Sequence, residues 1–420
     1  MIPENETRRN VAGDIVPEDW KQNIIVIWIG QAFSIVSSSA AGFAAMWYIT
    51  ETTGSPLMLS LGAIFVLLPM GILSPFGGII ADRYDRKKVI MISDLSVGVI
   101  SIILGLVVLF GVISLPLLLV VLMTRSCAQA FHSPAMTSLM PLMVPEKHLV
   151  RINALDQALV SASAICGPVI GIFLYTAIGF EAVLFLDAIC AIIACICLAI
   201  RKAPKTGNGV TDGKTAMSEL KDGLQYIKTD RGLFQLFVVC TIIMIVSMPV
   251  GSLFPMMTYD VFSGTGYQAS LIEAIWGVGM LIGSLVLVVW GGFNRLMIIV
   301  FVSGLGVGIT TMLCGLLQES QFNTFVILTG IMAFAMSLFA GPIMPIMQKR
   351  VPQEKMGRIM GLYITLATLA SPIGLVFAGI FAEKIGISMW FFISGAALCI
   401  VVAVAIFFKD LRQLDNFTNL

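Results

Sequence analysis

The chain has 420 residues, of which 58% are hydrophobic and only 12% are charged, and its formal net charge is +1. A soluble protein of this length needs a polar surface that so few charged residues cannot supply, which excludes a soluble enzyme. The balanced charge offers no basic surface to nucleic acid, and the 8 cysteines form no CxxC pair that would predict a metal site. The composition therefore predicts an integral membrane protein whose main partner is the lipid bilayer.

Twelve apolar runs follow one another along the chain, and each is long enough to cross about 30 Å of hydrocarbon as a helix. Residues 1–22 are rich in acidic side chains and are predicted to be an N-terminal tail instead of a cleaved signal peptide. Six runs form a predicted N-terminal bundle over 23–200, at about 23–49, 57–81, 89–111, 115–138, 152–178 and 181–200. Six more form a C-terminal bundle over 232–408, at about 232–257, 268–290, 296–317, 322–347, 359–382 and 388–408.

The basic residues predict which side of the membrane each connection occupies. All but two of the 25 Lys and Arg residues lie in the tails or in alternate connections, Lys384 lies in a connection of the other set, and Arg125 lies within a span. Because Lys and Arg concentrate on the cytoplasmic side, the chain is expected to cross the cell membrane twelve times with both termini in the cytoplasm. Residues 409–420 then form a cytoplasmic C-terminal tail.

The longest connection, 201–231, separates the two predicted bundles on the cytoplasmic side. Its second part places Met217, Leu220, Leu224 and Ile227 at helical spacing. That pattern is typical of a short amphipathic helix on the inner membrane surface, although a solvated linker is the alternative.

The two halves of the chain resemble each other. The segment VPEKHLVRIN at 144–153 has a counterpart, VPQEKMGRIM, at 351–360, and each is preceded by a predicted helix end with a proline, at Pro134 and at Pro342. Downstream, Gly167 and Pro168 correspond to Ser371 and Pro372, and Gly167, Pro168 and Pro372 are predicted helix-bend and packing positions. An internal repeat of six spans predicts a transporter whose pathway runs between two similar bundles.

The connection between the second and third spans, GGIIADRYDRKK at 77–88, resembles the loop signature of the major facilitator superfamily. The matching residues are Gly78, Asp82, Arg83, Arg86 and Lys87, and the resemblance implies that they form an inner gate. Gly78 is expected to let another helix approach closely. The family commonly has glycine where this chain has Asp85, which puts the tight turn of the loop in question.

Across nearly the whole chain, further segments resemble the macrolide-efflux branch of that superfamily, such as WIGQAFS at 28–34, AFHSPA at 130–135 and SPIGLVFAGIFAEKIG at 371–386. The resemblance implies an all-α fold of twelve helices in two bundles with pseudo-twofold symmetry. It also implies proton-driven export of amphiphilic drugs by alternating access, by a monomer without a cofactor. A siderophore, lipid or nutrient carrier of the same fold is the first alternative, and a non-transporting membrane sensor is the second. The sequence contains no GxxxxGK[ST] loop, the phosphate-binding motif of many ATPases, so ATP is not the expected energy source.

Four charged residues within the predicted spans are candidates for proton coupling or substrate binding, because a charge at a helix centre costs about 2.5–3.5 kcal/mol. Arg125 is expected either to favour the charged form of a nearby carboxylate during proton exchange or to lock two spans in a static ion pair. Asp94 is expected to pair with the basic loop or Arg151, and the role of Asp187 is left open. Glu273 is predicted to carry a proton or attract a cationic drug, with simple contact to the headgroups as the alternative.

Overall fold

The computed structural model describes residues 16, 19–201, 225–290, 296–351 and 353–414. Within these ranges every regular element is a helix, and twelve of the helices are long and apolar enough to cross a membrane. The predicted number of spans is therefore confirmed for the part of the chain that is described.

The first six spans are α1 to α6. Their bounds are α1 Trp20–Thr53, α2 Pro56–Arg83, α3 Arg86–Leu109, α4 Leu115–Met143, α5 Leu149–Ala177 and α6 Phe180–Ala199, with a short 3-10 helix, Glu146–His148, before α5. α1 begins at Trp20, three residues before the predicted span, while most of the predicted tail lies outside the described residues. Of the predicted amphipathic helix, only the end at 225–229 is described, and it is helical.

The remaining spans include two that are interrupted. The elements are α8 Arg231–Ser252, α9 Phe254–Phe262, α10 Gly266–Trp290, α11 Leu296–Cys314, α12 Phe322–Ala340, α13 Ile343–Arg350, α14 Gln353–Ile385, α15 Ile387–Phe407 and α16 Lys409–Arg412, with a 3-10 helix, Glu319–Gln321, before α12. The single run predicted over 232–257 is divided near Pro249 and Pro255, because proline lacks the N–H that continues a helix.

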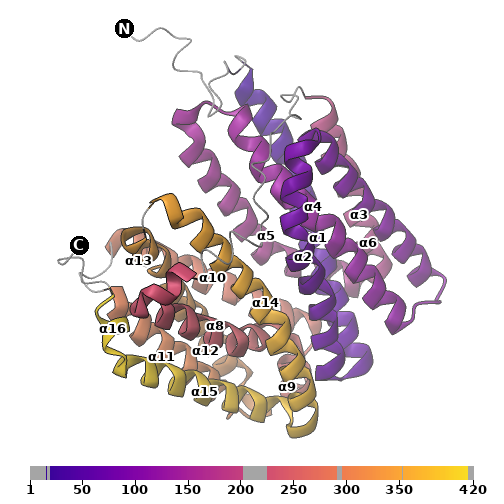
Figure 1. The fold of residues 1–420 in the computed structure, drawn as a ribbon. Coiled ribbons are helices and arrows are strands. Elements are labelled where there is room, and N and C mark those ends of the chain that lie inside the picture. Colours follow the sequence, from indigo (N-terminus) through magenta and orange to yellow (C-terminus); the bar gives the residue numbers. More distant parts are fainter. Residues whose placement is uncertain (1–15, 17–18, 202–224, 291–295, 352, 415–420) are drawn as a thin grey trace, which may run out of the picture. The chain divides into compact units, whose positions relative to one another are not determined.

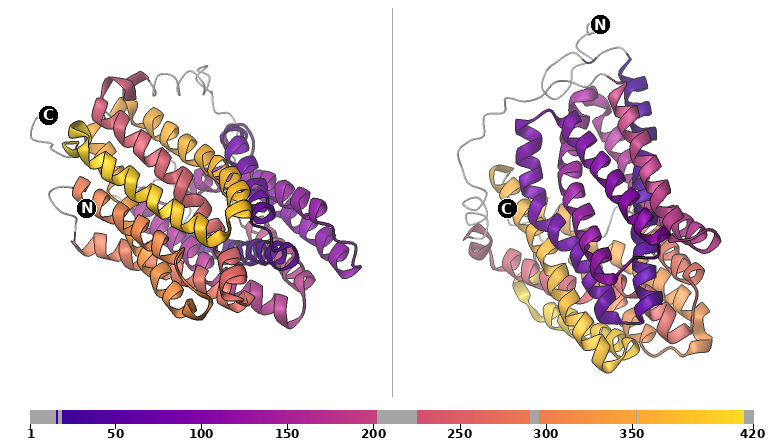
Figure 2. Two further views of the ribbon diagram at one scale, coloured as in Figure 1. Left: turned by 90° about the horizontal axis from the view of Figure 1, so that it is seen from below. Right: turned by 90° about the vertical axis from the view of Figure 1, so that its right-hand side faces the viewer.

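The chain divides into two compact units, Met1–Tyr48 with Phe65–Val210 and Ile49–Ile64 with Thr211–Leu420. The end of α1 and the beginning of α2 thus cluster with the second unit. The exact limits of the two predicted bundles, 23–200 and 232–408, stay predictions. Each unit is built from long helices, as the views in Figures 1 and 2 show.

These segments are helical because a helix satisfies its own backbone hydrogen bonds where no water is available. Large apolar side chains also point outwards from the units: Ile103, Phe173 and Ile327 are each more than half exposed, as expected for surfaces that contact lipid. Small residues line the contacts between helices. A Cβ added to Gly98 of α3 would lie 3.3 Å from Ala191 Cβ of α6, and one added to Gly279 of α10 would lie 2.6 Å from the Gly330 oxygen of α12.

The expectation that Pro134 marks a helix end is wrong, because α4 continues through it to Met143. Proline deprives the carbonyl four residues earlier, that of Ala130, of its helical hydrogen bond. Membrane helices tolerate this where neighbouring helices cover the site. Here α2 packs against the site, because a Cβ at Gly77 would meet the Ala130 carbonyl. Pro342, in contrast, does lie at a break, between α12 and α13.

Candidate functional site

Arg125 and Asp187, which are 62 residues apart in sequence, form a buried ion pair in the first unit. The Arg125 Nη1 atom of α4 lies 2.6 Å from Asp187 Oδ2 of α6, and the two side chains are 11% and 1% exposed. Ser101 of α3 donates to the same carboxylate oxygen at 2.7 Å. From α1, Ser37 and Ser38 donate to Oδ1 at 3.1 and 2.9 Å. Arg125 also donates to Ser101, so four helices meet at one hydrogen-bonded charge pair.

Asp94 lies in a second polar cluster of the same unit. Gln31 Nε2 of α1 donates to Asp94 Oδ2 at 3.2 Å, and Ser34 Oγ donates to Oδ1 at 3.5 Å. His132 Nε2 of α4 is 3.4 Å from Asp94 Oδ1, with side chains 12% and 6% exposed. The expected pairing of Asp94 with the basic loop or Arg151 is therefore wrong. Asp94 points into the bundle on the inward face of α3, where α1 and α4 supply its partners.

The basic loop between α2 and α3 holds the ends of several helices together within the first unit. Asp85 is the N-cap of α3, with φ of −60°, and its carboxylate accepts from the Lys87 backbone N–H at 3.0 Å. An aspartate N-cap satisfies the helix start without the positive φ that favours glycine, which explains the departure from the family pattern. Arg86 donates to the Ala81 and Ser138 carbonyls at 3.1 and 2.9 Å.

Lys87 completes this arrangement at the end of α6. Its Nζ donates to the carbonyls of Ala199 and Arg201 at 2.9 and 2.7 Å. A cation at a helix C-terminus compensates the partial negative charge there. Arg83 is exposed, and the Asp82 side chain lies outside the described residues. The gate assignment of the five motif residues thus stays a prediction.

The expectation that Gly78 allows a close helix approach is wrong. A Cβ added to Gly78 would meet nothing within 4 Å, whereas the adjacent Gly77 faces α4. Gly167 does make a close contact, because a Cβ there would lie 3.2 Å from the Ala40 backbone nitrogen of α1. Pro168 and Pro372 lie inside α5 and α14. Their predicted roles at helix bends stay predictions.

Glu273 lies on α10 of the second unit and is partly buried. Among the described residues, no hydrogen bond or ion pair involves its carboxylate. Trp276, one turn further along α10, packs against Phe254 with ring centroids 5.5 Å apart. Glu273 is therefore, among the described residues, an unpaired carboxylate one helical turn from an aromatic contact, and its predicted role in proton or drug binding stays a prediction.

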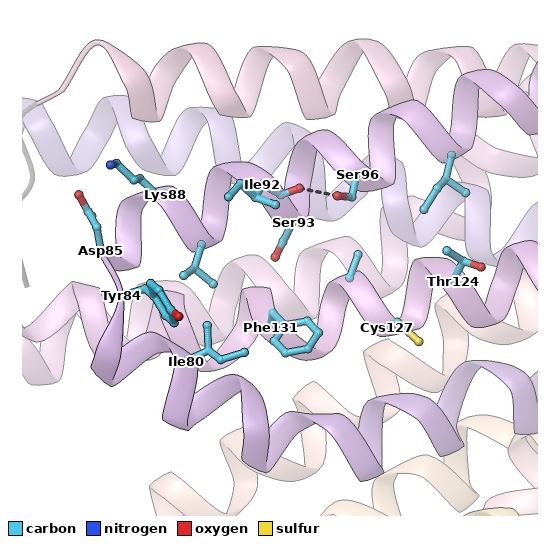
Figure 3. Close-up of a pocket in the computed structure, with 13 residues that line it drawn as sticks. Ile80, Tyr84, Asp85, Lys88, Ile92, Ser93, Ser96, Thr124, Cys127 and Phe131 are labelled. Carbon is cyan, nitrogen blue, oxygen red and sulfur yellow. Dashed lines mark hydrogen bonds between the residues drawn. The ribbon is translucent and has the colours of Figure 1, made fainter. Parts of the chain in front are cut away.

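A cavity of about 610 Å³ opens between α2, α3 and α4. Its walls are mostly apolar, with Phe131 and Ile92 on opposite helices, and Figure 3 shows Asp85, Lys88 and Tyr84 at one end and Thr124 at the other. None of Arg125, Asp187, Asp94 and Glu273 lines it. No group of three potential metal ligands occurs within the described ranges.

Sequence reasoning missed His132 and the hydroxyl groups of α1 as members of these clusters. A signal for them was present: Gln31, Ser34, Ser37 and Ser38 recur every three or four residues in an otherwise apolar span. Such spacing places polar groups on one helix face. That face supplies hydrogen bonds to both Asp94 and Asp187.

Comparisons with known proteins agree with this architecture. The family model of the Major Facilitator Superfamily matches residues 27–296 and 239–419. Macrolide efflux protein A of Streptococcus pyogenes is 33% identical over 398 residues, which cover 94% of this chain and 98% of that protein. Multidrug efflux pump Tap of Mycolicibacterium fortuitum is 27% identical and covers 88% of this chain and 91% of its own length.

The fold is also found among solved structures. A POT family transporter in complex with 5-aminolevulinic acid aligns with a TM-score of 0.75 at 13% identity, covering 92% of this chain and 96% of the other. The predicted all-α fold class is thereby confirmed. With a family model that matches almost the entire chain, the protein belongs to the major facilitator superfamily and is a multi-pass membrane transporter, not an enzyme.

Proposed function

We propose that this protein exports amphiphilic drugs or antibiotics, with macrolide-like compounds as the first cargo to test, and that a proton gradient drives the export. The main support for this class of cargo is the similarity to a macrolide efflux protein over 94% of the chain. Similarity to a multidrug efflux pump over 88% supports the same direction of transport.

The proposed setting is the cell membrane, with both termini in the cytoplasm and one chain as the working unit. The distribution of Lys and Arg supports this orientation. The two units would expose the cargo site to either side of the membrane in alternation, as in other transporters with repeated halves.

Charged groups within the spans support proton coupling, because a membrane protein retains such costly groups where they serve ion or substrate movement. The candidates are the Arg125–Asp187 pair and Asp94 in the first unit and Glu273 in the second. Glu273, with Trp276 nearby, suits the protonated amine of a cationic drug, since a carboxylate and an aromatic face both attract cations. No cofactor enters this proposal.

The test is drug accumulation in an efflux-deficient bacterial host that carries this chain, compared with the same host carrying an empty vector. We expect cell-associated radiolabelled macrolide to fall several-fold, and a protonophore to restore it. Higher accumulation in cells with the chain would instead indicate an uptake carrier. Purified protein that moves no substrate across proteoliposome membranes under a proton gradient would contradict transport of the tested compounds.

A further inference from the structure

The Asp94 cluster contains buried polar atoms that lack a hydrogen-bond partner. His132 Nε2 is 3.4 Å from Asp94 Oδ1, which is an ion-pair distance, but its geometry does not meet that of a hydrogen bond. Gln31 Oε1 in the same cluster is also buried without a partner. Buried polar atoms are normally satisfied, so each exception calls for an explanation, such as a functional role or a bound water.

The two buried carboxylates of the first unit differ in how their charge is balanced. Asp187 faces Arg125, which keeps its proton at any physiological pH, so that pair is neutral without taking up a proton. Asp94 faces an imidazole, which is neutral or cationic depending on pH. With neutral His132 the Asp94 pair carries one uncompensated negative charge in a low-dielectric bundle, and one added proton makes it neutral.

Among the residues that the structure describes, the other groups around the pair do not supply this missing positive charge. α1 contributes the uncharged Gln31 and Ser34. Asp156 of α5 interacts electrostatically with His132, and Cys195 of α6 does so with Asp94. Arg125 lies two turns away on α4 and is engaged with Asp187. A second carboxylate near the imidazole increases the tendency of the cluster to bind a proton.

The polar face of α1 links this cluster to the other charge pair. Ser34 donates to Asp94, and Ser37 donates both to the Ser34 carbonyl, at 3.1 Å, and to Asp187. The two clusters therefore share the polar face of α1.

We propose that Asp94 and His132 form a proton-binding site in the first unit, separate from the Arg125–Asp187 pair, and that this site takes up and releases one proton in each transport cycle. The role of this site in the transport cycle rests on the proton-driven export proposed above. Binding of a proton by Asp94 and His132 does not depend on that proposal.

Proton binding can be measured directly because the chain has only two histidines, His132 and His148. His148 lies outside the spans, against Trp20 with ring centroids 5.2 Å apart, so His148→Gln leaves His132 as the single imidazole. In this background, NMR of isotope-labelled histidine in lipid nanodiscs should show His132 titrating. Adding Asp94→Asn removes the facing carboxylate and should move the midpoint down by about one pH unit or more, whereas Asp94→Glu retains a carboxylate and should leave the midpoint unchanged. An imidazole whose midpoint is the same in all three proteins would overturn the site.

The transport role is tested by the pH dependence of macrolide efflux in proteoliposomes. We expect His132→Gln to flatten the dependence on inner pH, while the matched substitution His148→Gln leaves it unchanged. An unaltered pH profile in an active His132→Gln protein would overturn the role in the cycle. If wild-type protein exports no macrolide while His132 still titrates with Asp94, the proposed function fails and the proton site stands.

Discussion

Arg125 and Asp187 are each tolerable in the bilayer only because of the other. Arg125→Ala would leave Asp187, which is 1% exposed, as an unpaired buried charge, and breaking such pairs costs about 3–5 kcal/mol. We expect Arg125→Ala to lower the thermal stability of the purified protein and to reduce efflux at least tenfold. Arg125→Lys should keep part of both, because it retains the cation but loses the guanidinium geometry.

The double variant Arg125→Ala with Asp187→Asn distinguishes a framework role from a role in proton movement. If the pair is a static lock, removing both charges should restore much of the stability and of the transport that the single variant loses. Restored stability without transport would assign the pair to the transport cycle. Efflux by Arg125→Ala at the wild-type rate and equal expression would contradict either role.

Glu273 offers a test of cargo recognition in the second unit. Glu273→Gln keeps the size and polarity of the side chain but cannot ionise. We expect weaker export of cationic macrolides, by roughly tenfold if one desolvated charge contact is lost, and unchanged export of a neutral amphiphile of similar size. Equal export of both compounds by wild type and variant would show that Glu273 only contacts the membrane interface.

At the scale of whole helices, substitutions of two adjacent glycines of α2 are expected to have opposite effects on the stability of the protein. A Cβ at Gly77 would press on the Ala130 carbonyl of α4 and lie 3.2 Å from Phe131 Cα, whereas a Cβ at Gly78 meets nothing within 4 Å. Gly77→Ala should destabilise the protein by about 1–3 kcal/mol. Gly78→Ala should be neutral or slightly stabilising, because alanine is the better helix former.

Thermal unfolding of the two purified variants, followed by light scattering in the same detergent, measures this difference. Each variant is the control for the other, since both add one methyl group to the same helix turn. Equal melting temperatures would mean that the approach of α2 to α4 is not limited at Gly77.

At the scale of the whole molecule, the residues of the basic loop are expected to divide between two roles, assembly of the helices and gating of transport. Arg86 and Lys87 bind the ends of helices in the first unit, so their loss should reduce protein levels. Arg83 is exposed and makes no such contact in the described structure. We expect Asp82→Asn and Arg83→Cys to insert normally but to lose most transport, because their charges would act during the cycle and not in folding.

The matched control is Lys384→Cys, which removes a charge near the end of α14, on the predicted outer side. Efflux should be close to wild type in this variant at equal expression. Near-normal efflux in Asp82→Asn and Arg83→Cys as well would remove the gate assignment.

The sequence by itself determined the number of spans, the family and the presence of costly charges. Each of these depends on local properties: the length of an apolar run, the loop motif at 77–88, and a charge such as Arg125 within such a run. Tertiary structure decided which charges meet. Apart from the polar face of α1, the spans are apolar around most of their circumference, so little in the sequence predicts how each helix is rotated about its axis. Only the packing of α1, α2, α3, α4 and α6 against one another turned Asp94 towards His132, set Arg125 against Asp187, and assigned the close contact to Gly77 instead of Gly78.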